Sequence, residues 1–198
     1  MIRKQIRPAI LLTLVLIVVT GLIYPGIVTG IAQLVFPRQA RGSLVVHNGQ
    51  TVGSSLIGQK FTEPWYFHPR PSAAGDGYDA TASGGTNKGP TDRKLADTLI
   101  AGAIAQAESD GAPKGRVPSD MATTSASGLD PHISPANALF QVARVAAARG
   151  VDSSQVRDLA LHYVESRQFG FLGEPRVNVL ALNLALDSAF PHPASARK

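Results

Sequence analysis

The stretch "PAILLTLVLIVVTGLIYPGIVTGIAQLVFP", Pro8 to Pro37, decides how this chain is organised, because it contains no charged residue. A bilayer core needs about 20 such residues in one helix. The first part, Ala9 to Tyr24, is almost purely aliphatic, whereas Pro25 and Gly26 predict a kink near the far end. We therefore expect a transmembrane anchor over residues 9–36.

Basic residues lie on both sides of this stretch and bear on its orientation. Arg3, Lys4 and Arg7 lie in a basic N-terminal tail, residues 1–8, while Arg38 and Arg41 follow the anchor. Three basic side chains and the terminal amine against two favour an N-terminus inside the cell. A cleaved signal peptide has a similar basic start, but its apolar core is shorter and is followed by a small-x-small site that is missing here. We expect residues 38–198 to form one soluble, extracytoplasmic domain.

The composition narrows the classes of function. The chain has 198 residues, enough for one domain with a sizeable core, and no cysteine, which excludes disulfides, thiolate zinc sites and thiol nucleophiles. Of the formal charge of +5, the basic tail supplies three, and no block of Lys and Arg interleaved with aromatic residues occurs. Nucleic acid is therefore not an expected partner.

Turn and capping signals divide the soluble part into short elements. Asn48-Gly49 predicts a hairpin between strands at 44–47 and 51–57. A helix is expected after Thr91 or Asp92, ending near 110–111, and a short strand is conceivable at 121–124. Three more helices are expected, over "ANALFQVARVAAAR", "VRDLALHYVESR" and "VNVLALNLALDSAF", with Ser134 and Asp152 as N-caps and Gly150 as a stop. The fold class is α+β, with a small sheet, about four helices and long ordered loops.

The loop "SGGTNKGPTD", Ser83 to Asp92, resembles a phosphate-binding loop in the spacing of Gly84 and Gly89. The resemblance fails where a lysine should be, because Pro90 stands there and also removes a backbone N–H donor. We interpret the loop as a tight turn that starts the following helix, with glycines supplying positive φ angles. The nearby aromatic residues Trp65, Tyr66 and Phe67 are expected to pin the long loop onto the core.

Individual polar residues give weaker signals. Asp130 and His132 could form a catalytic pair, but Pro131 between them favours an Asx-type turn. Gln141, in a helix, either reaches a ligand or faces solvent, and solvent is the default expectation. No catalytic or metal-ligating set emerges from the spacing of the histidines. Five arginines are expected on solvated faces or in local ion pairs: Arg144, Arg149, Arg157, Arg167 and Arg176.

Several long stretches, taken together, resemble one family. They are "TGLIYPGIVTGIAQLVFPRQARGSLV", "YFHPRPSAAGDGYDATASGGTNKGPTD", "TTSASGLDPHISPA" and "FGFLGEPRVNVLALNLALD". In this order they are similar to the C subunit of the Kdp high-affinity potassium-transporting P-type ATPase. The resemblance implies a non-catalytic subunit that assembles with a channel-like potassium-binding subunit and an ATP-hydrolysing subunit in the bacterial inner membrane. The chain itself has no D-K-T-G-T phosphorylation motif.

The resemblance also implies a chaperone-like role that raises the ATP affinity of the hydrolysing subunit. The residues of this chain that it would assign to nucleotide contact are Ser83, Gly84, Gly85, Thr86, Asn87, Gly89, Pro90 and Thr91, with Gln141. An extracytoplasmic domain cannot touch cytoplasmic ATP, so we expect any effect on ATP binding to be indirect. No tightly bound cofactor is expected, and ATP only within the complex. The alternative is a membrane-anchored enzyme or ligand-binding module that acts through the glycine-rich loop.

Overall fold

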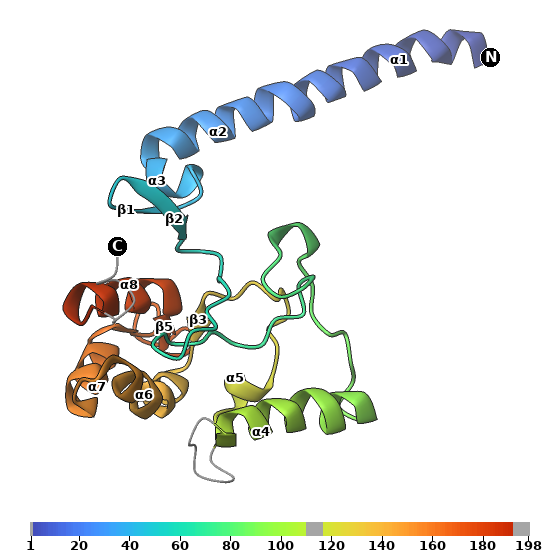
Figure 1. Cartoon of the computed structure of the whole chain (residues 1–198). Coiled ribbons are helices and arrows are strands. Elements are labelled where there is room, and N and C mark those ends of the chain that lie inside the picture. The colour runs from blue at the N-terminus through green and yellow to red at the C-terminus, as the bar shows by residue number, and fades with distance from the viewer. Residues whose placement is uncertain (1, 110–116, 192–198) are drawn as a thin grey trace. The chain divides into compact units, whose positions relative to one another are not determined.

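The computed structural model describes residues 2–109 and 117–191. The chain divides into two compact units, Met1–Val52 and Gly53–Lys198 (Figure 1). The first unit holds the long N-terminal helix and most of a hairpin. The second holds the remaining helices, a three-stranded sheet and the long loops. The α+β class with one N-terminal apolar helix, expected from the sequence, is confirmed.

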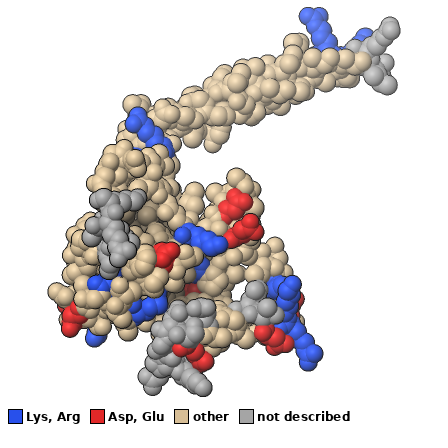
Figure 2. Space-filling model, in the orientation of Figure 1, with Lys and Arg blue, Asp and Glu red and all other residues tan. Residues whose placement is uncertain are grey.

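The predicted anchor is a nearly continuous helical rod. It consists of α1 (Ile2–Val18), a π-helical turn η1 (Val19–Ile23) and α2 (Tyr24–Val35), and a short α3 (Pro37–Ala40) follows. The wide turn ends two residues before Pro25, which has no N–H to continue the α-helical ladder. Lys4–Val35 is long and apolar enough to cross a membrane, with a mean hydropathy of 2.5 over its most apolar 18 residues. Figure 2 shows Lys and Arg at the two ends of the rod and no charged side chain between them on the visible face.

The predicted hairpin is present and its second strand is shorter than expected. Strands β1 (Leu44–His47) and β2 (Gln50–Ser54) pair with each other. Asn48 and Gly49 both have positive φ, 50° and 77°, as a type I′ turn requires. The strand ends at Ser54 rather than Ile57 because the backbone turns there: the N–H of Ile57 donates to the Ser54 carbonyl at 3.4 Å.

The core of the second unit is built from helices packed on a small antiparallel sheet. The helices are α6 (Pro135–Arg149), α7 (Ser153–His162) and α8 (Val179–Ala189), and the strands, in the order β3-β5-β4, are β3 (His132–Ile133), β5 (Arg176–Asn178) and β4 (Val164–Glu165). Val177 faces Ile133 on one side and Val164 on the other. Val177, Val145 and Leu182 are fully buried, which places the centre of the core between sheet and helices.

The capping signals of the sequence act as predicted. Ser134 Oγ accepts the N–H of Asn137, and the carboxylate of Asp152 accepts the N–H of Ser154. Gly150 ends α6 in the left-handed conformation, with φ of 66°. Residues Val177 and Asn178, expected in the last helix, lie in β5, and the Asn178 side chain caps α8.

Four further helical elements belong to the described part of the second unit. They comprise a 3₁₀ turn η2 (Ala80–Ala82), a π-helical stretch η3 (Leu95–Ile100), α4 (Ala101–Ser109) and α5 (Ser119–Ala122). The strand expected at 121–124 is therefore wrong, because residues up to Ala122 form a helical turn. The expected helix end at 110–111 lies outside the described residues.

Aromatic residues fasten the long loop to the core, as expected. Phe67 is fully buried, and its backbone forms a reciprocal pair of hydrogen bonds with the Asn183 side chain of α8, at 2.9 and 3.0 Å. Tyr66 donates its hydroxyl to the Asp187 carboxylate at 2.8 Å. Burial and this hydrogen bond raise the pKa of Tyr66 to about 12.

Arg149 corrects the expectation that the arginines lie on solvated faces or in local ion pairs. Its side chain is fully buried and pairs with Asp187 at 2.8 Å. It also donates to the carbonyl oxygens of Trp65 and Phe190, and its guanidinium lies 5.3 Å from the Tyr66 ring centroid. Arginine periodicity on a helix cannot reveal a loop that folds over it from 84 residues away.

Candidate functional site

The first half of the glycine-rich loop is anchored on a second loop, residues 125–128. Ser83 Oγ and the N–H of Gly84 both donate to the Ser127 carbonyl oxygen, at 3.0 and 2.9 Å. A Cβ added to Gly85 would lie 2.9 Å from the Ala126 carbonyl oxygen, so the two backbones meet where only glycine fits. The expected positive φ angles are wrong for these glycines, and Asn87 has one instead, at 53°.

The second half of the loop starts the following helix. The N–H of Asp92 donates to the Gly89 carbonyl at 3.0 Å, which closes a turn with Pro90 at its second position. Asp92 then caps the helix by accepting the N–H of Leu95 at 3.0 Å. Lys88 Nζ lies 2.9 Å from the Asp92 carboxylate, and its hydrogen bond is the main cause that lowers the pKa of Asp92. The expected turn and cap are confirmed.

This geometry differs from that of a phosphate cradle. The N–H of Gly84 is already bonded to Ser127, Pro90 has no N–H, and Lys88 is paired with a carboxylate. Asn87, Gly89, Pro90 and Thr91 are exposed, whereas Gly84, Gly85 and Thr86 are partly covered. The loop therefore presents a rigid outer edge, and its contact with a nucleotide stays a prediction.

Gln141 does not face solvent, which corrects the default expectation. It is 3% exposed, and its amide exchanges two hydrogen bonds with the backbone of His68, at 2.7 and 3.0 Å. It also donates to Asn137 Oδ1 at 2.7 Å and accepts from Arg144 at 2.6 Å. Gln141 thus pairs with the backbone of His68 in the same way as Asn183 pairs with the backbone of the preceding loop residue, Phe67.

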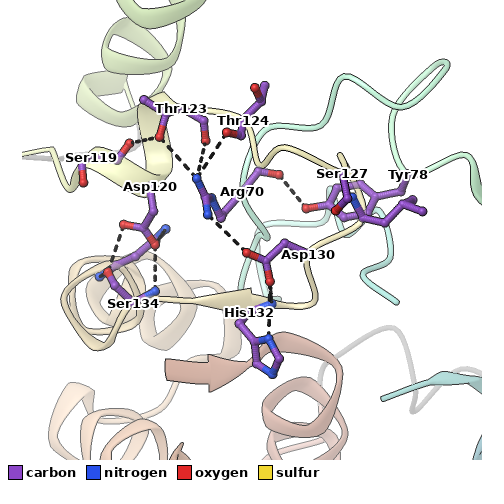
Figure 3. A network of polar contacts seen from close by, with 12 residues as sticks. Arg70, Tyr78, Ser119, Asp120, Thr123, Thr124, Ser127, Asp130, His132 and Ser134 are labelled. Carbon is purple, nitrogen blue, oxygen red and sulfur yellow. Dashed lines mark hydrogen bonds and ion pairs between the residues drawn. The ribbon is translucent and has the colours of Figure 1, made fainter. Parts of the chain in front are cut away.

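Arg70 is the centre of a polar network that the sequence did not predict (Figure 3). Its guanidinium lies 3.2 Å from the Asp130 carboxylate and donates to the Thr124 carbonyl at 3.3 Å. The Tyr78 hydroxyl donates to the Arg70 carbonyl at 2.7 Å. Arg70 thereby joins the loop that carries it to residues 123–130. The signal available in the sequence was its setting in "HPRP", where flanking prolines stiffen the backbone.

Asp130 and His132 form the Asx-type turn that the sequence favoured. One carboxylate oxygen of Asp130 accepts the N–H of His132 at 3.0 Å, and His132 Nδ1 lies 3.4 Å from the same oxygen. Burial is the largest single influence on the pKa of Asp130 and raises it. The hydrogen bonds from His132 and the Arg70 charge together outweigh burial and bring this pKa below its ordinary value.

Asp120 explains why its segment is helical rather than extended. Its carboxylate accepts the backbone N–H of Ser134 at 2.7 Å, the Ser134 hydroxyl at 3.0 Å and the Asn137 amide at 3.0 Å. These bonds fasten α5 to the first turn of α6, where a carboxylate also complements the helix dipole. Tertiary bonds of this kind override a weak preference for strand.

A groove of about 390 Å³ lies beside this network. Its ionisable lining residues are Arg70, Asp120, Asp130, His132, Glu174 and Arg176. Asp120 and Asp130 already accept hydrogen bonds from the chain, so their first role is to hold loops together. Within the described ranges, no group of three His, Asp or Glu side chains is arranged to hold a metal ion.

The fold and the loop network define a class: an α+β protein with an apolar N-terminal helix, whose long loops are bonded to the core by buried polar side chains. A family model described as K⁺-transporting ATPase, c chain (KdpC), matches residues 6–188. The chain belongs to the KdpC family. Membership and the apolar helix together make it a membrane-associated subunit of a potassium-transporting ATPase.

Relatives of the same length support this membership. A potassium-transporting ATPase KdpC subunit of Gemmatimonas aurantiaca is 57% identical over 195 residues, which cover 98% of both chains. The KdpC subunit of Koribacter versatilis is 55% identical over 96% of this chain and 98% of its own. That of Rhodospirillum rubrum is 52% identical, over 95% and 97%.

Proposed function

We propose that this chain is a non-catalytic subunit of an ATP-driven potassium uptake pump, in which it stabilises the complex and promotes ATP binding indirectly. Its partners are a channel-like potassium-binding subunit, an ATP-hydrolysing subunit and the lipid around its helix. The observation that carries the proposal is the apolar helix Lys4–Val35, with its basic start, ahead of a folded polar unit.

The helix determines how the subunit can influence ATP. Arg3, Lys4 and Arg7 at its start outnumber Arg38 and Arg41 after it, which favours a cytoplasmic N-terminus and a single crossing. The second unit then lies outside the bacterial inner membrane, whereas ATP is inside. An effect of the second unit on ATP binding must therefore pass through the helix and the partner subunits. It would appear as a difference in the free energy of ATP binding between two states of the complex.

The geometry of the glycine-rich loop supports a docking role rather than a nucleotide cradle. The N–H of Gly84 is engaged by Ser127 and the Lys88 ammonium by Asp92, so a phosphate that used these two donors would have to displace bonds that hold the loop's shape. Its exposed edge, 87–91, is available for contact with a partner subunit. ATP contact with Gln141 would require breaking its bonds to His68.

Thiol labelling of intact cells tests the orientation. The chain has no cysteine, so Ser153→Cys, on an exposed site of α7, reports on the second unit, and Gln5→Cys reports on the N-terminal tail. A membrane-impermeant reagent should label Ser153→Cys before lysis and Gln5→Cys only after lysis. The reverse pattern would overturn the orientation and restore direct ATP contact.

ATP affinity of the assembled pump tests the coupling. A chain that ends at Val52 keeps the helix and loses the second unit. We expect its complex to bind ATP more weakly than the complete one, whereas crosslinks from the second unit to the nucleotide-binding lobe of the hydrolysing subunit would refute an indirect effect. An enzyme or free ligand-binding module would instead be active when purified alone.

A further inference from the structure

The turn between β4 and β5 exposes large apolar side chains at its tip. Phe169 is 87% exposed, Phe171 is 70% exposed and Leu172 is 48% exposed. Phe169 and Phe171 are the only strongly exposed phenylalanines in the described part of the second unit. We call residues 167–174 the Phe169 turn. Contiguous exposed apolar side chains are a sign of an interaction site, whereas single ones are ordinary.

The backbone of the Phe169 turn is fixed in the free subunit. Gln168 and Leu172 exchange two hydrogen bonds of 2.9 Å in an antiparallel bridge, and the N–H of Gly170 donates to the Arg167 carbonyl at 3.1 Å. The rings are therefore held outward by a closed turn and not by a flexible loop. Such preorganisation reduces the entropy lost when a partner covers them.

The backbone conformation of Phe169 is itself unusual. Its φ is 54°, in the left-handed region where bulky residues rarely occur, and Gly170 follows with φ of 83°. Asn or Gly would fit the first position with less strain and would not expose a ring to water. A strained position that also leaves an aromatic ring in solvent points to a role in contact.

The charges around the tip distinguish a protein partner from a lipid surface. Arg167 pairs with Glu174 at 2.6 Å, and Arg176 pairs with Glu165 at 2.9 Å. The base of the turn is thus neutral and its arginines are already engaged. A turn that inserts among anionic lipid headgroups relies on unpaired Lys and Arg. Apolar anchors inside a polar rim are instead the pattern of protein interfaces.

From the exposed rings, the fixed backbone and the paired rim, we propose that the Phe169 turn inserts into an apolar, uncharged pocket on the extracytoplasmic face of a partner subunit of the pump. This inference rests on the proposed function. Phe169 and Phe171 are the anchors, and the two ion pairs form the rim that excludes water around them.

The affinity of the complete subunit for the pump complex that lacks it tests the two rings. In detergent, Phe169→Ser/Phe171→Ser should bind at least roughly 30-fold more weakly, as expected for interface anchors. Leu161→Ser, at an exposed leucine of α7, is the matched control and should change affinity by less than about 2-fold. Because both rings lie in solvent, thermal unfolding of the double variant should match that of wild type. Unchanged affinity would overturn the inference and leave the proposed function standing.

A single labelled cysteine distinguishes the partner from the lipid. Leu172→Cys, beside the two anchors and itself 48% exposed, carries a polarity-sensitive fluorophore in the complete chain, reconstituted into vesicles that contain brominated lipids. Its emission should shift to the blue only when the partner subunits are added. If brominated lipid quenches the fluorophore in the absence of the partner subunits, the turn binds the membrane surface and the proposed protein pocket is wrong. If the wild-type chain does not bind the pump complex at all, the proposed function fails as well.

Discussion

Replacement of Arg149 by alanine should destabilise the second unit far more than its single charge suggests. The side chain is fully buried and bonds to Asp187, the Trp65 carbonyl and the Phe190 carbonyl. Removal leaves these oxygens without their cation at a largely buried site and cancels the contact with the Tyr66 ring. Loss of one partner of a buried pair costs about 3–5 kcal/mol.

Thermal unfolding of the complete chain in detergent, followed by circular dichroism at pH 7, measures this effect. For a domain of this size, each kcal/mol lowers the Tm by about 2–4 °C, so Arg149→Ala should lose roughly 6–20 °C. Arg149→Lys should recover only a part, because one ammonium cannot reach all three partners. Arg157→Ala removes an exposed arginine of α7 and should shift the Tm by less than about 2 °C. Equal shifts for Arg149→Ala and Arg157→Ala would refute the buried clamp.

Three further perturbations test the loop network. The pKa of Asp130 is lower in the folded protein than in the unfolded chain, so the stability that this carboxylate contributes is present above about pH 4 and is lost as the pH falls through the folded pKa. Asp130→Asn should therefore flatten the decline of Tm below that pH. Parallel curves of Tm against pH for the variant and wild type would contradict this. Gly85→Ala places a Cβ 2.9 Å from the Ala126 carbonyl oxygen. It should lower the free energy of unfolding by about 1–3 kcal/mol and speed the hydrogen exchange of residues 83–92. The control Gly84→Ala, where the Cβ has open space around it, should be nearly neutral. Gln141→Leu leaves the N–H and the C=O of His68 unpaired and should lower the free energy of unfolding by about 1–3 kcal/mol for each of these groups. At temperatures where the variant is folded, the ATP affinity of its complex should be unchanged. A lower ATP affinity under those conditions would favour a nucleotide contact.

Features with a local cause could be predicted from the sequence. Ser134, Gly150 and Asp152 act on N–H and C=O groups within a few residues, so their capping roles follow from short motifs. The Asn48-Gly49 turn has the same character. The long apolar helix could be predicted because a bilayer core needs about 20 consecutive apolar residues, and no other stretch of the sequence is both that long and that apolar.

Features with a distant cause could not be predicted. Arg149 and Gln141 lie on helix faces whose partners come from the loop at 65–68, and helical periodicity does not say what covers a face. Positive φ angles were expected of the loop glycines, whereas Gly85 is needed because a Cβ there would meet the backbone of Ala126, a residue far away in sequence. The Arg70 network has the same origin, because the partners of its guanidinium are more than 50 residues downstream.

The hydrogen bonds between Phe67 and Asn183 have a consequence for synthesis. The two residues are 116 positions apart, and a ribosome that adds 5–20 residues per second needs about 6–23 s to make the intervening chain. Throughout that interval the Tyr66–Phe67 segment has no α8 to bury it. The nascent chain must therefore hold this aromatic loop unprotected until α8 emerges, which makes the second unit dependent on α8 for escape from aggregation and proteolysis.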